Sequence, residues 1–361
     1  MQCRRCLLQA AGVARAAAVD PAVMALAERA VDLAANSVAQ SSASTYATNR
    51  RRFLTFCTQE LGVPSAEVFP RNRRRDLNRA HVRLFLAYAT TRFAPSTVDG
   101  TLSALGDWQR ARGVGKHETI GRDPVVRRIL AESLRRRAPT APLTAAVKAP
   151  LPVRLLLLLI AWMAAKAAEA PARAETLAQD ACWLVIGFFG MMRRSELAGL
   201  RVGDVGGIPG GGIEVSIRRS KTDQLGAGAT VLLARTSGSG VPVEGIVGRH
   251  LEFVTRRGAA PGEPLFSRGR QGNALVRACD KSEFTRRLRD LLAELQQSYP
   301  QLGLNLGQFS AHSLRRGGAT AAANGGVSLE AIKAHGRWKS DAVNAYIWPA
   351  PAVRMRIVAG M

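Results

Sequence analysis

A proline-rich segment near the middle of the chain limits which elements can run through it. Four prolines occur in APTAPLTAAVKAPLP, at positions 138–152. Proline fixes the backbone angle φ and lacks an N–H group, so neither a helix nor a central strand can continue through such a segment. We therefore expect a linker at 138–152. The chain of 361 residues is long enough for about two domains, one on each side of this linker.

The half before the linker shows the apolar spacing of helices. We expect these helices at 45–61, 78–91, 96–112 and 124–137, with hydroxyl caps before the first and Pro95 near the start of the third. Residues 20–40 also have helical apolar spacing, whereas 1–37 as a whole are expected to be a flexible leader. A helical domain at 38–137 follows from this pattern.

The charge of the chain is strongly positive. There are 51 Lys and Arg against 27 Asp and Glu, a net charge of +24, and between 46 and 137 the count is 19 against 8, a balance of +11. Arginine runs lie beside apolar segments, as on folded helices with one basic face. A solubilising surface or a codon bias toward arginine is the alternative. The placement favours a nucleic-acid partner, with these arginines as candidate contacts: Arg50, Arg51, Arg52, Arg73, Arg74 and Arg75.

The half after the linker combines helices with a hairpin. Apolar helices are expected at 153–169 and 177–189, and two short β-branched runs at 213–217 and 230–233 indicate an antiparallel hairpin. The remainder, 241–361, has the pattern of helices broken by glycine and proline. The expected fold is therefore mainly α with a small antiparallel β-sheet.

Cysteine usage and hydropathy exclude several classes of protein. The five cysteines are too few and too scattered for a disulfide framework, which favours a reducing compartment. Cys3 and Cys6 form a lone CxxC with no second pair at zinc-finger spacing, so no metal site is expected. The longest apolar stretch, 155–165, is too short to span a bilayer. We expect an intracellular protein with no membrane partner.

Several polar residues stand out near buried segments. Arg193 and Glu196 follow an apolar helix and lie three residues apart, a spacing also typical of a surface ion pair. Lys221 lies after a predicted strand and before a glycine-rich return, where a solvated turn lysine is the commoner interpretation when this residue is taken alone. His312 and Arg315 share one helical face. Such a pair suits phosphate binding better than a protein core, although His312 alone could be a core histidine.

Tyr346 is one of only four tyrosines and lies 31 residues after Arg315. It is the second-last residue of the run HGRWKSDAVNAYI at 335–347, in which His335, Arg337 and Trp338 are possible hydrogen-bond donors. A partly buried helix tyrosine is the plain structural interpretation.

Taken in order, the Arg and Glu pair, the hairpin Lys, the His-x-x-Arg run, the donor turn and the late Tyr resemble the tyrosine recombinase (phage integrase) family. The resemblance covers 183–347 closely and extends more weakly to STYATNRRRFLTFC at 44–57. It implies a helical core-binding domain at 38–137 and a mixed α/β catalytic domain at 153–361.

The resemblance also implies the role of each residue. Arg193 and Arg315 would hold the non-bridging oxygens of a scissile phosphate, and Tyr346 would attack the phosphorus. His312 would act as general acid or base, and Lys221 would protonate the departing 5′ oxygen. Glu196 matches the acidic residue that supports the site.

One position departs from the family pattern. Counting back from Tyr346 without gaps places Arg337 where the family has His or Trp. Trp338, one residue on, and His335 are the familiar donors. We select Trp338, so the expected catalytic set is Arg193, Glu196, Lys221, His312, Arg315, Trp338 and Tyr346.

The resemblance implies a site-specific DNA recombinase, of integrase or transposon type, that works through a 3′-phosphotyrosine without metal or other cofactor. Its partner would be duplex DNA with paired recombination sites, bound as a dimer on one site and as a homotetramer in the synaptic complex, in a bacterial cytoplasm or a eukaryotic nucleus. A type IB topoisomerase shares this chemistry, but the His-x-x-Arg run looks like that of the recombinases and not like that group. A catalytically silent DNA-binding relative is a further alternative. The apolar tail 347–361 could pack on its own domain or on a neighbour.

Overall fold

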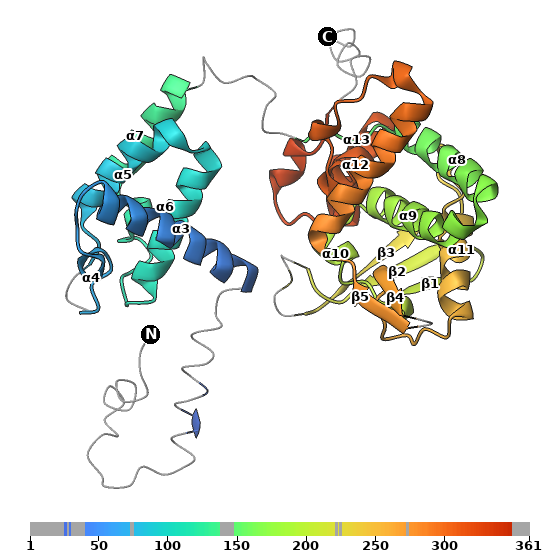
Figure 1. Cartoon of the computed structure of the whole chain (residues 1–361), viewed down its shortest axis with the longest axis horizontal. Helices are drawn as coiled ribbons and strands as arrows, with labels where there is room; N and C mark the ends of the chain where they lie inside the picture. Colours follow the sequence, from blue (N-terminus) through green and yellow to red (C-terminus); the bar gives the residue numbers. More distant parts are fainter. Residues whose placement is uncertain are drawn as a thin grey trace. The chain divides into compact units, whose positions relative to one another are not determined.

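The computed structural model describes residues 40–72, 76–137, 148–220, 223, 226–271 and 274–348, together with 25, 26 and 29. The chain divides into two compact units, 1–145 and 146–361. The point of division falls inside the proline-rich segment 138–152. The two units are described separately below (Figure 1).

The described part of the N-terminal unit contains helices joined by turns, and none of its described residues forms a strand. Its elements are α3 (Gln40–Gln59), α4 (Ser65–Val68), α5 (Arg79–Arg92), α6 (Pro95–Arg110), the 3₁₀ turn η1 (Ile120–Arg122) and α7 (Pro124–Arg137). Asn78 caps α5 by accepting a hydrogen bond from the Ala80 N–H, and Pro95 occupies the first turn of α6, where a missing N–H costs nothing. The four helices expected here are all present. The helix expected at 20–40 lies almost entirely outside the described residues.

Aromatic side chains fill the core of this unit. The rings of Phe53 and Phe56 on α3 each meet the ring of Phe85 on α5 edge-on, with ring centroids 5.4 Å apart in both pairs. All three side chains are buried. Edge-to-face pairs of this kind add to the free energy gained from burying the rings. The core thus fixes α3 against α5 and leaves the arginine-rich faces outside it.

The C-terminal unit combines longer helices with short strands. Its helices are α8 (Val153–Glu169), α9 (Pro171–Phe189), α10 (Arg194–Leu197), α11 (Val243–Arg256), α12 (Lys281–Ser298), α13 (Ala311–Asn324) and α14 (Leu329–Gly336). The strands are β1 (Val205–Gly207), β2 (Ile213–Ile217), β3 (Ala229–Leu233), β4 (Ser267–Gln271) and β5 (Ala274–Ala278). The 3₁₀ turns are η2 (Val202–Asp204), η3 (Pro300–Leu302), η4 (Leu306–Gln308) and η5 (Asp341–Ala345).

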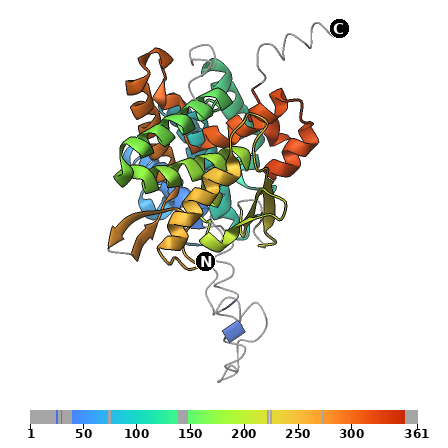
Figure 2. The same cartoon turned by 90° about the vertical axis from the view of Figure 1, so that its right-hand side faces the viewer.

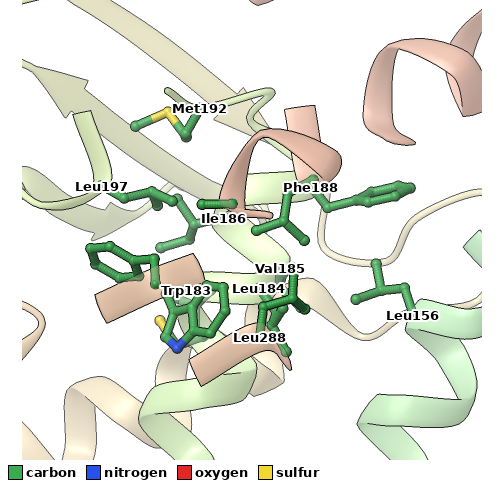
Figure 3. Packing of buried hydrophobic residues seen from close by; sticks show 14 of the residues in the cluster. Leu156, Trp183, Leu184, Val185, Ile186, Phe188, Met192, Leu197 and Leu288 are labelled. Carbon is green, nitrogen blue, oxygen red and sulfur yellow. The ribbon is translucent and has the colours of Figure 1, made fainter. Parts of the chain in front are cut away.

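Helix α9 forms the centre of this unit. It packs against α8, α11 and α13, and the turned view shows α8 and α9 running side by side (Figure 2). Residues from Cys182 to Phe188 are buried without interruption, so the helix is apolar around most of its surface. Figure 3 shows Trp183, Ile186 and Phe188 of α9 among the packed side chains of the core. The helix begins at Pro171, six residues earlier than expected, with proline at a first-turn position.

Two glycines bring α13 into close contact with α9. A Cβ atom on Gly318 would lie well inside van der Waals contact of the Phe188 carbonyl oxygen, and one on Gly317 would clash with the Leu151 carbonyl oxygen. Only glycine permits this approach of helix and backbone. The glycine pair therefore fixes the position of the His312 and Arg315 helix.

The strands form two separate antiparallel sheets. The first has the order β1-β2-β3, with Val215 paired to both Val205 and Val231, so the expected hairpin is present and gains a short third strand. The mainly α fold with a small antiparallel sheet is confirmed. The expectation of helices throughout 241–361 was wrong, because β4 and β5 form a second, two-stranded sheet. The β4 sequence SRGRQ lacks the β-branched residues that signal a strand.

Candidate active site

A buried carboxylate joins two segments that are far apart in the sequence. Glu196 accepts hydrogen bonds from the backbone N–H of Arg193 at 2.8 Å and from its guanidinium at 2.6 Å. Its other ion pair, with the Arg337 guanidinium, measures 3.0 Å. The Glu196 side chain is fully buried between these two cations. Burial raises the pKa of the Glu196 carboxyl, but the charge of Arg337 and the hydrogen bonds from Arg193 outweigh this effect, so the pKa is lowered. Glu196 is therefore an anion that holds Arg193 in place.

Two residues near this carboxylate have left-handed backbone angles. Met191 has φ of 46° and Arg337 has φ of 60°, a region that non-glycine residues adopt at a cost in free energy. Arg337 donates to the carbonyl oxygens of Gly190 at 3.2 Å, Met191 at 3.2 Å and His335 at 2.9 Å. These bonds offset the backbone strain. They also tie the turn after α9 to the turn after α14.

Arg315 is completely buried in the C-terminal unit. Its guanidinium donates to the carbonyl oxygen of Met191 and, at 2.6 Å, to that of Gly336. The face of the guanidinium stacks on the ring of Trp338, 3.9 Å from its centroid. Burial, together with the positive charge of Arg193, lowers the pKa of Arg315 to about 9, so the group stays charged at neutral pH. A buried cation held by neutral carbonyls has charge available for an anionic ligand.

His312 and Tyr346 meet directly beside this buried cation. The imidazole Nε2 of His312 lies 3.0 Å from the phenol oxygen of Tyr346. The Tyr346 ring also packs edge-on against Trp338, with centroids 5.1 Å apart. The histidine lies on α13, and the tyrosine is the residue that follows η5. The pair has the geometry of a nucleophile and its proton acceptor.

The environment of His312 favours the neutral imidazole. Burial lowers the pKa of His312 to about 4, and the charges of Arg315, Arg316, Arg194 and Arg193 act in the same direction. A neutral imidazole can accept a proton from the Tyr346 hydroxyl at physiological pH. The cations that keep it neutral are also those that could bind a phosphate group.

No protein-family model matches the sequence, and no curated protein matches it. Solved structures do match. The XerH site-specific recombinase bound to palindromic difH substrate, a post-cleavage complex, has a TM-score of 0.56 at 15% identity, covering 88% of this chain and 79% of that chain. A lambda integrase dimer bound to a COC′ core site has a TM-score of 0.51 at 14% identity, covering 94% and 84%.

The chain has the tyrosine-recombinase fold. Within this fold the structure brings together six of the seven residues expected to form the catalytic set: Arg193, Glu196, His312, Arg315, Trp338 and Tyr346. The seventh, Lys221, lies outside the described residues.

The three candidate donors before Tyr346 occupy different positions in this fold. His335 lies 2.7 Å from the carbonyl oxygen of Phe189, and Arg337 binds the three carbonyl groups and Glu196 described above. Trp338 contacts both Arg315 and Tyr346. Of the three, only Trp338 has a described contact with those two side chains.

Sequence reasoning overlooked Arg316 and the structural role of Arg337. The guanidinium of Arg316 lies over the Tyr346 ring, 5.1 Å from its centroid. Arg316 is four residues after His312, a spacing that places both on one helical face, so this signal was available in the sequence. The pairing of Arg337 with Glu196 spans 141 residues and leaves no local signal.

The candidate DNA contacts of the N-terminal unit differ in exposure. Arg51 is exposed. The guanidinium of Arg50 pairs with Asp107 at 2.8 Å, and that of Arg52 donates to the Asn49 side chain at 2.6 Å. Two of these three arginines are thus held by contacts within their own unit. Residues 73–75 lie outside the described part of the chain.

Among the described residues, no group of three or more His, Cys, Asp or Glu side chains is arranged to hold a metal ion. Over the same residues, none of the helices has the length and hydropathy needed to cross a membrane.

Proposed function

We propose that the protein is a tyrosine-type site-specific DNA recombinase that cleaves and rejoins duplex DNA through a 3′-phosphotyrosine intermediate. The observation that carries this proposal is the 3.0 Å contact between the His312 imidazole and the Tyr346 hydroxyl, set beside the buried Arg315 and the buried Glu196–Arg193 pair. The likeness to XerH and lambda integrase, both solved with DNA, supports the substrate class.

The cleavage step follows from the chemistry of these groups. Neutral His312 accepts the proton of the Tyr346 hydroxyl as the phenol oxygen attacks the scissile phosphorus. The new bond joins phosphorus to the tyrosine oxygen, and the bond from phosphorus to the 5′ oxygen breaks. The departing 5′ oxygen takes a proton, a role we propose for Lys221. The product is a 3′-phosphotyrosine and a free 5′-hydroxyl, which can reverse the reaction without ATP because the phosphodiester energy is kept.

Arginine charges stabilise the transition state in this proposal. Phosphoryl transfer depends on positioning and on neutralising charge that builds up on the phosphate oxygens. Arg193 and Arg315 would contact the non-bridging oxygens, and Trp338, which stacks on Arg315, would act as the third donor. Glu196 would keep Arg193 in place through the ion pair at 2.6 Å.

DNA binding would use both units. We propose that the basic N-terminal unit acts as the core-binding domain and the C-terminal unit as the catalytic domain. The protein would act as a dimer on one site and as a homotetramer on paired sites.

The C-terminal unit has an apolar groove of about 1310 Å³ whose lining includes Leu151, Phe188, Ile332 and Trp348. Residues 349–361, expected to pack on their own unit or on a neighbour, lie outside the described residues.

A nicked suicide substrate tests the proposal. The nick lets the short 5′-hydroxyl fragment diffuse away after cleavage, so the covalent complex accumulates. We expect the parent protein to give a DNA-linked band on a denaturing gel and Tyr346→Phe to give none, because the variant lacks the attacking oxygen. Absence of the band with the parent on DNA from the flanks of its own gene would contradict the proposal.

The burial of Arg315 favours a second candidate, a DNA-binding relative that does not cleave. Its side chain is 0% exposed, and its guanidinium donates to the carbonyl oxygens of Met191 and Gly336. If Arg315 keeps these two hydrogen bonds when DNA is bound, its guanidinium does not reach the scissile phosphate. Specific binding in a filter assay, together with no covalent complex on nicked substrates, would support this candidate.

A further inference from the structure

The segment that carries Tyr346 is attached to α13 by contacts outside the proposed reacting groups. Thr320 and Arg316 lie four residues apart on α13 and therefore share one face of the helix. Both contact the segment 346–348, the last described stretch of the chain. The inference drawn from these contacts rests on the proposed role of Tyr346 as nucleophile.

Thr320 bridges the backbone on both sides of Ile347. Its hydroxyl donates to the carbonyl oxygen of Tyr346 at 3.3 Å and accepts from the N–H of Trp348 at 3.1 Å. A hydroxyl is both donor and acceptor, so one side chain fixes two backbone groups at once. The backbone N–H of Tyr346 is held separately by the Val343 carbonyl oxygen at 2.8 Å. Three backbone groups are therefore hydrogen-bonded around the nucleophile: the N–H and the carbonyl of Tyr346 and the N–H of Trp348.

Arg316 holds the side chains of the same segment. Its guanidinium carbon lies 5.1 Å from the centroid of the Tyr346 ring and 6.0 Å from that of the Trp348 ring. A cation over an aromatic face attracts the ring electrostatically. Its Nη1 atom is buried and has no hydrogen-bond partner among the described residues. The guanidinium is thus placed by its contacts with rings.

We propose that Thr320 and Arg316 are positioning residues that hold Tyr346 at His312, with Thr320 fixing the backbone and Arg316 fixing the ring. The alternative is that His312 alone positions the tyrosine, through the 3.0 Å contact with its hydroxyl. These two accounts differ in what happens when the Thr320 hydroxyl is removed and His312 is left intact. A displacement of about 1 Å at a reacting atom can cost on the order of a hundredfold in rate.

Thr320→Val tests the backbone contact because valine keeps the shape and loses the hydroxyl. With saturating nicked DNA in a single turnover, we expect covalent complex to form at least about tenfold more slowly, because both hydrogen bonds of this hydroxyl to the segment are lost, and we expect unchanged DNA affinity. Thr320→Ser keeps the hydroxyl and should therefore keep the rate of the parent protein. Thr58→Val is the matched control, since the Thr58 hydroxyl also bonds a backbone carbonyl, that of Leu54 at 3.0 Å.

Arg316→Met tests the ring contact, with Arg316→Lys as the conservative variant. We expect Arg316→Met to slow covalent complex formation about tenfold and Arg316→Lys to recover part of the rate, because lysine keeps the charge but loses the planar face. Arg256→Met is the matched control: the Arg256 guanidinium lies 5.1 Å from the Phe253 centroid, the same distance as in the Arg316 contact.

Hydrogen exchange of the Trp348 amide provides a readout without DNA. We expect about tenfold faster exchange in Thr320→Val and unchanged exchange in Thr320→Ser. Unchanged exchange in Thr320→Val would overturn the inference, as would a parent-like cleavage rate. If the parent forms no covalent complex but the exchange shift appears, the recombinase proposal fails and the attachment of the segment to α13 stands.

Discussion

The His312 imidazole Nε2 and the Tyr346 hydroxyl oxygen lie 3.0 Å apart. In the mechanism proposed above, this pair is the nucleophile and its proton acceptor. Arg193, Arg194, Arg315 and Arg316 surround His312, and we propose that their charge receives that of a phosphate group. The first prediction follows from the effect of those arginines on the histidine.

The pH dependence of cleavage should report the low pKa of His312. Burial and the surrounding arginines lower this pKa to about 4, so the imidazole is neutral and able to accept a proton above about pH 5. With subsaturating DNA, the rate of cleavage should fall only below about pH 5. With saturating DNA the acid limb should move to higher pH, because the phosphate charge offsets the arginines. Single-turnover rates between pH 4 and 8 test this, and an acid limb near pH 6.5 with subsaturating DNA would contradict it.

Replacing Glu196 should destabilise the C-terminal unit strongly. Glu196→Gln leaves the partly buried guanidinium groups of Arg193 and Arg337 without their fully buried carboxylate partner, and breaking one side of a buried ion pair costs about 3–5 kcal/mol. Urea unfolding measures the change in the free energy of unfolding. The control is Glu252→Gln, whose exposed pair with Arg256 at 3.3 Å should be worth no more than about 1 kcal/mol. Equal effects of the two substitutions would show that the buried pair is not structural.

A methyl group at Gly318 should separate α13 from α9. Gly318→Ala places a Cβ against the Phe188 carbonyl oxygen, and overpacking of this kind costs about 1–3 kcal/mol. Gly248→Ala, on α11, is the control because nothing lies within 4 Å of its added Cβ. That substitution should stabilise the protein by up to about 1 kcal/mol through helix propensity. Thermal unfolding of both variants gives the comparison, and the same sign for both would contradict the packing argument.

Salt dependence should separate Arg51 from Arg50. Arg51 is exposed, whereas the Arg50 guanidinium pairs with Asp107 at 2.8 Å. If Arg51 contacts a phosphate, Arg51→Ala should reduce the slope of log affinity against log salt concentration by about 0.9. Arg50→Ala should leave that slope nearly unchanged. Fluorescence anisotropy over a range of salt concentrations measures both slopes, and a larger change for Arg50→Ala would reverse this assignment.

Local signals in the sequence were sufficient for most of the helical fold. The helices 124–137 and 153–169 have the expected bounds because apolar spacing and a proline before or at the first turn act within a few residues. The β4–β5 sheet was missed because SRGRQ is polar and lacks β-branched residues. Its pairing depends on the neighbouring strand and not on intrinsic preference.

The candidate site was predictable as a set of residues and not as an arrangement. Spacing alone could not decide between His335, Arg337 and Trp338, because the left-handed turn at Arg337 determines which side chain meets Arg315. The guanidinium of the buried Arg315 donates to the carbonyl groups of Met191, which follows α9, and of Gly336, the last residue of α14. Such contacts form only when distant segments pack together, so they leave no trace in local sequence.

The central claim is that Tyr346 becomes covalently linked to DNA. The most direct measurement is mass spectrometry of the protease-digested covalent complex formed on a nicked substrate. We predict one nucleotide-linked peptide, containing Tyr346 joined to a 3′-phosphate, and its absence from Tyr346→Phe. Linkage to another residue such as Tyr299, or no linkage on DNA that the protein binds specifically, would contradict the account.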